Sequence, residues 1–246
     1  MRTPSAHGTR HALLTVFALT AAVDLTSLAV GFAPGHTVAK PLLMPLLAAY
    51  CVASGAPRLL VGALLCGWGG DVLLLSDADP AFLAGMASFA VGHVCYLALF
   101  QAYGSPRARV GLLAPVYATA LVATVVALWP DLPAGLRVPV AGYSVLLTTM
   151  ACASAVRFGA RTGLGGALFL LSDTLIATGV ADWPQLPRPD FWIMLTYVAA
   201  QFLLASGTTR ALEARPGPMA TYGVVRSAER ATPRSTKRPT PRSTTP

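Results

Sequence analysis

Residues 59–75 read LLVGALLCGWGGDVLLL, a nearly unbroken apolar run with one carboxylate, Asp71, inside it. An ionised group in the hydrocarbon of a bilayer costs roughly 3 kcal/mol or more, so such residues are rare unless they serve a site. Two further apolar runs carry one acid each, Asp24 and Asp173. Around Asp71 and Asp173 the pattern is shared: small or apolar residues precede the acid and leucine-rich sequence follows. These acids are therefore the first candidates for a function.

The composition is typical of a polytopic membrane protein. The 246 residues are 54% hydrophobic and 11% charged, and the mean hydropathy is +0.60, whereas soluble domains carry about 25% charged residues. Apolar segments use nearly the whole chain, so we expect no separate soluble catalytic domain. The first run is long enough to span a membrane and lacks a clear cleavage site, so we expect no cleavable signal peptide.

Eight segments are long and apolar enough to cross a bilayer, which takes roughly 20 residues of helix. Only helices and closed barrels satisfy the backbone in lipid, and these runs are too long for barrel strands. The sequence therefore predicts an all-α integral membrane protein, an eight-transmembrane-helix bundle. Pro41 and Pro45 are expected to kink the second span. The expected spans are residues 11–32, 38–54, 57–76, 81–103, 109–129, 136–156, 161–180 and 190–209.

The two halves of the chain resemble each other weakly. Asp71 and Asp173 each fall on the third span of a four-span half, and their separation nearly equals that of Tyr96 and Tyr197. This pattern indicates two related four-helix halves, as in some transporters.

Basic residues predict the orientation, because they are enriched in cytoplasmic loops. Of the 18 Lys and Arg residues, all but Lys40, Arg137 and Arg188 fall on the side that carries both termini. We therefore expect a multi-pass protein with residues 1–10 and 210–246 in the cytoplasm and residues 11–209 in the membrane. The alanine-rich, arginine-rich and lysine-poor composition indicates a bacterial cell membrane.

The last segment, residues 210–246, is rich in Arg, Pro, Thr and Ser, and Pro233-Arg234-Ser235-Thr236 recurs as Pro241-Arg242-Ser243-Thr244. It lacks the apolar content needed to fold, so we expect disorder. It either contacts anionic lipid or nucleic acid, or is a solvated tail that reinforces the topology, which is the simpler interpretation. The net charge of +8 comes mostly from this tail and does not indicate a nucleic-acid function.

With this orientation, polar side chains gather in the outer half of the bundle. The three acids lie beyond the midpoint of outward-running spans, and Lys40 lies near the outer end of the second span. Tyr197 and Gln201 are one turn apart and share a face of the eighth span. We expect a polar cavity there that is open to lipid or to the outer surface. Two further polar residues in the spans are His93, near mid-membrane, and Tyr143.

Each of these residues also has a purely structural interpretation. The acids can be hydrogen-bonded for stability, Asp24 can bind the backbone or Lys40, and Lys40 can extend to the interface. His93 can be a packed core histidine. The remaining three can hydrogen-bond between helices; they are Tyr143, Tyr197 and Gln201.

Other chemistries find little support. No second His or Cys stands at zinc-ligand spacing from His93, so no metal site is expected. A serine nucleophile (Ser88, Ser144 or Ser172) lacks the nucleophile-elbow sequence. The cysteines form no C-x-x-C pair and are interpreted as packing residues; they are Cys51, Cys66, Cys95 and Cys152.

Together the motifs resemble the YhhN-like membrane proteins, a family that includes the animal lysoplasmalogenases. The resemblance spans roughly residues 12–209 and implies eight transmembrane helices. For the active relatives it implies hydrolysis of the vinyl ether bond of lysoplasmalogens to a fatty aldehyde and a glycerophospho-head group. The matching pieces include Lys40-Pro41-Leu42-Leu43-Met44-Pro45-Leu46, Gly70-Asp71-Val72-Leu73-Leu74, Gly92-His93-Val94-Cys95-Tyr96, Tyr143, Ser172-Asp173, Thr196-Tyr197 and Gln201.

This chemistry fits the residues. Protonating a vinyl ether at carbon creates an oxocarbenium ion, so the step needs a neutral acid and a negative group near the developing cation. We predict that Asp71 and Asp173 are this pair, that His93 assists them, and that no cofactor is needed. A lipid substrate would be bound by Lys40, Tyr143, Tyr197, Gln201 and Asp24, in a cavity with an apolar slot for the tail and a cationic rim, where the Lys40 ammonium would bind the lipid phosphate. The alternatives are a small proton-coupled transporter that uses the same acids as relays, and a non-catalytic lipid-binding protein.

Overall fold

The computed structural model describes residues 4–76, 78–105 and 110–214, and eight helices account for nearly all of them. The predicted tail beyond residue 214 lies outside the described residues. No strand occurs in the described ranges. The helices are α1 (Pro4–Val30), α2 (Ala33–Ala53), α3 (Arg58–Leu73), α4 (Asp79–Tyr103), α5 (Val110–Leu128), α6 (Ala134–Phe158), α7 (Ala160–Val180) and α8 (Pro189–Glu213).

The prediction of an all-helical membrane bundle is confirmed. Six of the helices are long and apolar enough to cross a membrane, namely α1, α2, α4, α6, α7 and α8. The other two are apolar but shorter. Helix α3 has 16 residues, and the apolar part of α5 is Leu112–Leu128. The first and last helices extend past the predicted spans, to Pro4 and Glu213. A relation between the two halves stays a prediction.

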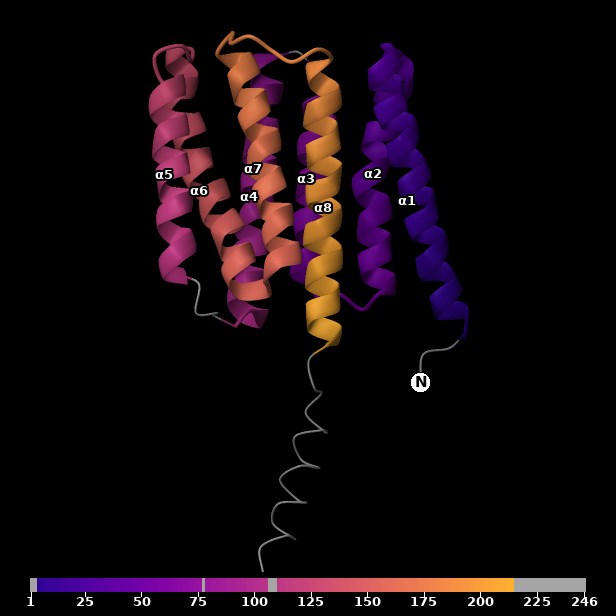
Figure 1. The fold of residues 1–246 in the computed structure, drawn as a ribbon. Coiled ribbons are helices and arrows are strands. Elements are labelled where there is room, and N and C mark those ends of the chain that lie inside the picture. The colour runs from indigo at the N-terminus through magenta and orange to yellow at the C-terminus, as the bar shows by residue number, and fades with distance from the viewer. Residues whose placement is uncertain (1–3, 77, 106–109, 215–246) are drawn as a thin grey trace, which may run out of the picture. The chain divides into compact units, whose positions relative to one another are not determined.

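The helices stand roughly side by side and alternate in direction (Figure 1). The turns α1–α2, α3–α4, α5–α6 and α7–α8 all lie at one end, which we call the upper end; α1 begins and α8 ends at the opposite one. Neighbours in the bundle are α1 with α2, α2 with α3, α3 with α4, α4 with α6, α6 with both α5 and α7, and, more weakly, α5 with α7.

Helix α8 is the most buried of the six long apolar helices. In its most apolar stretch of 18 residues, 56% of the residues are buried inside the protein. It bonds to α3 through Tyr197, to α4 through Gln201 and to α7 through Ser206. Small residues permit this close approach. A Cβ placed on Gly165 of α7 would lie 2.8 Å from the backbone nitrogen of Leu204, so only glycine fits.

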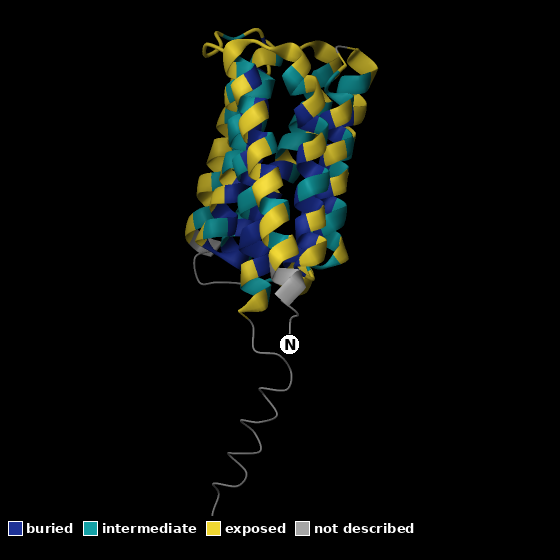
Figure 2. Cartoon of the chain, turned by 90° about the vertical axis from the view of Figure 1, so that its right-hand side faces the viewer, coloured by how far each residue is buried: buried dark blue, intermediate teal, exposed yellow. Residues whose placement is uncertain are grey.

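The outward faces of the helices are exposed (Figure 2). Many large apolar side chains lie among the exposed residues, as expected for a surface in contact with lipid tails. Leu19, Val38, Leu112 and Val138 are each more than half exposed. Polar side chains are instead found inside, where Asp24, Asp71 and His93 are almost completely buried. The sorting is therefore the reverse of that in a soluble domain.

One glycine determines how α6 and α7 pair. Only Gly159 lies between the two helices, and its φ of 93° is in the left-handed region that favours glycine. The chain therefore reverses direction at this single residue, and α7 packs back against α6. Tyr143 and Asp173 lie at nearly equal distances from Gly159 along the two helices, so the hairpin brings them to the same depth.

Candidate active site

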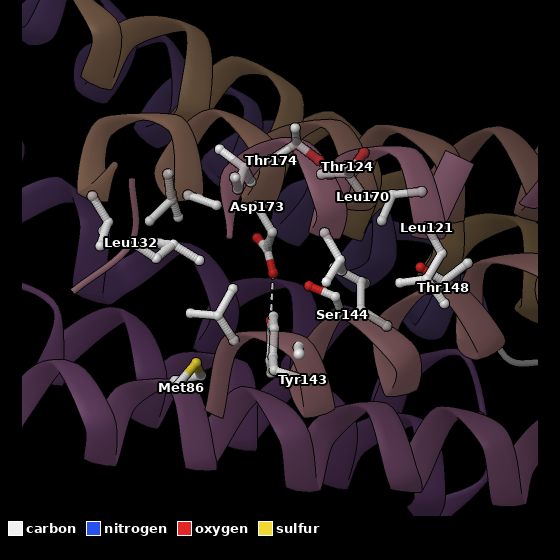
Figure 3. A pocket seen from close by; sticks show the side chains of 18 of the residues that line it. Met86, Leu121, Thr124, Leu132, Tyr143, Ser144, Thr148, Leu170, Asp173 and Thr174 are labelled. Atoms are coloured by element: carbon white, nitrogen blue, oxygen red, sulfur yellow. Dashed lines mark hydrogen bonds between the residues drawn. The ribbon is translucent and has the colours of Figure 1, made fainter. Parts of the chain in front are cut away.

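A cavity of about 330 Å³ lies between α4, α5, α6 and α7 (Figure 3). Its wall is mostly apolar, with Leu121, Leu170 and Met86 among the lining residues. Asp173 is the one carboxylate in the lining that the structure describes, and Arg137 is the one cation. The other polar groups in the lining are the indole of Trp129 and several hydroxyls, those of Tyr143, Ser144, Thr148, Thr124 and Thr174. An apolar chamber with one acid inside it suits an amphipathic substrate.

Asp173 is held by a short chain of hydrogen bonds. The hydroxyl of Tyr143 donates to Oδ2 of Asp173 (Figure 3). The Tyr143 oxygen also lies 3.0 Å from Nε2 of His93. A phenol has a single proton, which is used toward Asp173, so Nε2 of His93 must be the donor in the second bond. Three helices, α7, α6 and α4, thus contribute one member each.

This arrangement fixes the tautomer of His93. With the proton on Nε2, Nδ1 is an unprotonated acceptor, and it has no hydrogen-bond partner within the described part of the chain. The ring is 1% exposed and stacks edge-on against Phe169, with 4.8 Å between the centroids. His93 is therefore a neutral donor held in place by packing. It does not line the cavity and acts on Asp173 only through Tyr143.

Asp71 belongs to a second chain of hydrogen bonds. Its Oδ2 accepts from the Tyr197 hydroxyl at 2.8 Å. The Tyr197 oxygen in turn accepts from Nε2 of Gln201 at 3.3 Å, and Oε1 of Gln201 accepts from the Tyr96 hydroxyl at 2.8 Å. Each donor in this series points toward the carboxylate. Asp71 is 3% exposed and does not line the cavity.

Aromatic rings separate the two carboxylates. Phe89 lies edge-on against both Phe169 and Tyr197, with centroid distances of 6.2 and 5.9 Å. Phe169 also contacts Tyr197 at 5.5 Å. Phe89 faces the cavity on one side, and on the other it lies so close to Gly70 that no side chain fits there. The two acids are therefore placed on opposite sides of one aromatic layer.

Lys40 lies on the Asp71 side of this layer. Its side chain is 9% exposed, and no hydrogen bond or ion pair to it is found among the described residues. Its charge and that of Asp24 both act on Asp71 across the intervening space. Lys40 does not line the cavity that contains Asp173, so the cationic rim expected from the sequence is not formed by Lys40.

Asp24 has a partner that the sequence analysis missed. Nδ1 of His36 lies 2.8 Å from Oδ1 of Asp24, and Oδ2 has no partner within the described residues. Asp24 lies six residues before the end of α1 and His36 three residues after the start of α2, so both are near the turn between these helices. A histidine just across this turn from the acid was the available signal in the sequence. Asp24 therefore does not bind Lys40, one of its two predicted structural partners.

The structure thus gathers the predicted site residues into separate groups. Asp173, Tyr143 and His93 form one, and Asp71, Tyr197 and Gln201 form the other. Three groups were not singled out from the sequence: His36, the aromatic layer of Phe89 and Phe169, and Arg137 in the cavity wall. Within residues 4–76, 78–105 and 110–214 no cluster of three or more His, Cys, Asp or Glu residues is placed to hold a metal ion.

Comparison with known proteins identifies the family. Lysoplasmalogenase TMEM86B of Sus scrofa is 36% identical over 174 residues, which cover 71% of this chain and 74% of that protein. The Rattus norvegicus protein of the same name is 35% identical over 173 residues, with 70% and 71% covered. A lysoplasmalogenase of Mycobacterium tuberculosis is 32% identical over 213 residues, with 75% and 78% covered.

No solved structure matches the chain. The sequence model of the YhhN family matches residues 35–208, a range that contains Lys40, both acids of the predicted pair, His93 and the whole cavity lining. The chain therefore belongs to the YhhN family.

Proposed function

We propose that this protein is a membrane hydrolase that cleaves the vinyl ether bond of lysoplasmalogens. Relatives from both mammals and mycobacteria are named lysoplasmalogenases, and the similarity covers about three-quarters of each chain. The single observation that carries the proposal from the structure is the cavity, which is apolar and encloses one carboxylate, Asp173. An alkenyl chain matches the apolar wall, and its vinyl ether would lie beside the acid.

We assign Asp173 as the proton donor. The hydroxyl of Tyr143 donates to Oδ2, so a neutral Asp173 carries its own proton on Oδ1. Transfer of that proton to the β-carbon of the vinyl ether gives an oxocarbenium ion and an Asp173 carboxylate. The carboxylate then accepts a proton from the attacking water. The resulting hemiacetal collapses to a fatty aldehyde and a glycerophospho-head group, so one water is consumed for each substrate.

Asp71 supplies the negative charge of the pair. In this assignment Asp71 is the ionised member, because the charge of Lys40 acts on it, whereas no cation among the described residues acts on Asp173. Its Oδ2 accepts a hydrogen bond from Tyr197. Its field acts across the aromatic layer, where the low dielectric screens it weakly. The oxocarbenium ion would thus be stabilised by a charge that is fixed before the reaction begins.

The test is release of fatty aldehyde from a lysoplasmalogen by the purified protein in detergent. Two control substrates are needed, a lysolipid with a saturated ether and one with an ester at the same position. We expect aldehyde from the vinyl ether alone, because neither control forms an oxocarbenium ion by carbon protonation. A folded protein that releases no aldehyde in detergent, but moves protons across liposomes, would instead support the transporter.

A further inference from the structure

Among the described residues, one cationic side chain, Arg137, lines the cavity, and it lies toward the upper end. Arg137 is the fourth residue of α6, directly after the α5–α6 turn. Trp129 lines the same end and is 41% exposed, and Arg137 itself is half-buried. The guanidinium is therefore reachable from outside the bundle while its stem forms part of the wall.

Arg137 is held in position without losing its charge. Its Nε donates to the carbonyl of Leu132 and its Nη2 to the carbonyl of Pro130, both at 3.0 Å. No ion pair joins it to a carboxylate within the described ranges. The nearest acid in sequence, Asp131, accepts from the indole nitrogen of Trp183 at 2.8 Å. A guanidinium has five N–H donors, so Arg137 keeps donors for a ligand.

The spacing along α6 matches that of a lysolipid. Arg137 lies six residues before Tyr143, the residue that bonds to Asp173, a rise of about 9 Å at 1.5 Å per residue. In a lysoplasmalogen about seven bonds separate the β-carbon of the vinyl ether from the phosphorus, roughly 8 Å when extended. A phosphate at Arg137 would therefore bring the vinyl ether to the level of Asp173.

We infer that Arg137 binds the phosphate of the substrate at the mouth of the cavity and so sets the depth of the vinyl ether. A planar guanidinium matches phosphate better than an ammonium does, because it can donate two parallel hydrogen bonds. This inference rests on the proposed function. It gives Arg137 the role that the sequence analysis gave to Lys40.

The kinetic test compares Arg137→Gln with the wild type on two vinyl ethers, a lysoplasmalogen and the 1-alkenylglycerol that lacks the phosphate. Arg137→Gln should raise KM for the lysoplasmalogen about 10- to 100-fold, as for loss of hydrogen bonds to a charged group. KM for the alkenylglycerol should not change. Arg137→Lys should be intermediate. Arg188→Gln is the matched control, since Arg188 is an exposed arginine near the same end that does not line the cavity.

An equal loss on both substrates would overturn the inference, because Arg137 would then only support the α5–α6 turn through Pro130 and Leu132. An unchanged KM on both would overturn it as well.

A binding measurement separates this inference from the proposed function. Quenching of tryptophan fluorescence should report uptake of a saturated-ether lysolipid, which is not hydrolysed, because Trp129 lines the cavity mouth. Tighter binding of this lipid than of the matching 1-alkylglycerol, lost in Arg137→Gln, would support the phosphate site even if no aldehyde forms. Saturation by inorganic phosphate alone, with no dependence on the alkyl chain, would overturn a lipid head-group site.

Discussion

At the scale of single residues, the predicted acids differ in their surroundings. Asp173 faces a cavity and is oriented by Tyr143, whereas Asp71 is enclosed behind Phe89 and bonded to Tyr197. The sequence alone predicted that the two acids matter, because each interrupts an apolar span. It could not distinguish them, because their partners depend on which helices become neighbours. The aromatic layer between them was missed for the same reason.

Replacing either acid should abolish most of the activity. Asp173→Asn removes the proton donor and Asp71→Asn removes the fixed charge, and each should lower kcat at least about 100-fold. The variants should remain folded, since Asn keeps the size and an acceptor oxygen for the tyrosine. Asp182→Asn is a matched control, because Asp182 is exposed with a φ of 55°, a conformation that Asn tolerates. Near-wild-type hydrolysis by both site variants would rule out a paired-acid mechanism.

Lys40 should act on turnover rather than on substrate binding. It lies outside the cavity, and its charge acts on Asp71. Lys40→Met keeps the apolar stem but removes the charge, so we expect a lower kcat and an unchanged KM for lysoplasmalogen. Steady-state kinetics of Lys40→Met and Arg137→Gln, measured side by side on lysoplasmalogen, test this, because Arg137→Gln should instead raise KM. A raised KM in Lys40→Met would return Lys40 to the phosphate-binding role first predicted for it.

At the scale of the helices, the sequence located the elements well but not their contacts. Apolar runs separated by Pro, Gly and charged residues predict all eight helices to within a few residues, apart from longer helix ends such as those of α1, α2 and α8. Tyr197 and Gln201 indicated one polar face of α8, but the helices that this face meets could not be predicted, because its partners on α3 and α4 lie 126 and 105 residues away in the sequence. Small residues at the contacts, such as Gly165, carry that information only once the neighbours are known.

The packing of α7 against α8 should be sensitive to one methyl group. In Gly165→Ala the new Cβ would lie 2.8 Å from the nitrogen of Leu204 and 3.0 Å from the carbonyl of Ala200. Both contacts are backbone, so the helices must separate, at a cost of about 1–3 kcal/mol. Thermal unfolding in detergent would measure the loss.

Gly142→Ala on α6 is the control for this substitution. Gly142 is exposed and has open space where a Cβ would lie, so the change should be neutral or stabilise by about 0.5–1 kcal/mol. Equal melting temperatures for the two variants would contradict close packing at Gly165.

At the scale of the whole molecule, the orientation in the membrane is a prediction from the charges. The upper end carries Arg137 and Arg188, and Lys40 lies below it on α2. The other basic residues that the structure describes belong to helix ends on the opposite side; they are Arg10, Arg58, Arg157, Arg161 and Arg210. A fluorescent-protein fusion at the C-terminus should therefore mature, and an alkaline phosphatase fusion there should be inactive. An active phosphatase fusion would reverse the orientation and place the cavity mouth in the cytoplasmic leaflet.

The position of α8 has a consequence for synthesis. Tyr143 and Asp173 are 30 residues apart on one hairpin and can meet as soon as α7 enters the bilayer. Asp71 forms its hydrogen bond much later in synthesis, because its partner Tyr197 lies 126 residues downstream on the final helix. Until the ribosome completes that helix, Asp71 is in the membrane without Tyr197, its hydrogen-bond partner. In a chain truncated before α8, Asp71 therefore lacks Tyr197, so the membrane acquires a site with both carboxylates hydrogen-bonded only from a finished protein.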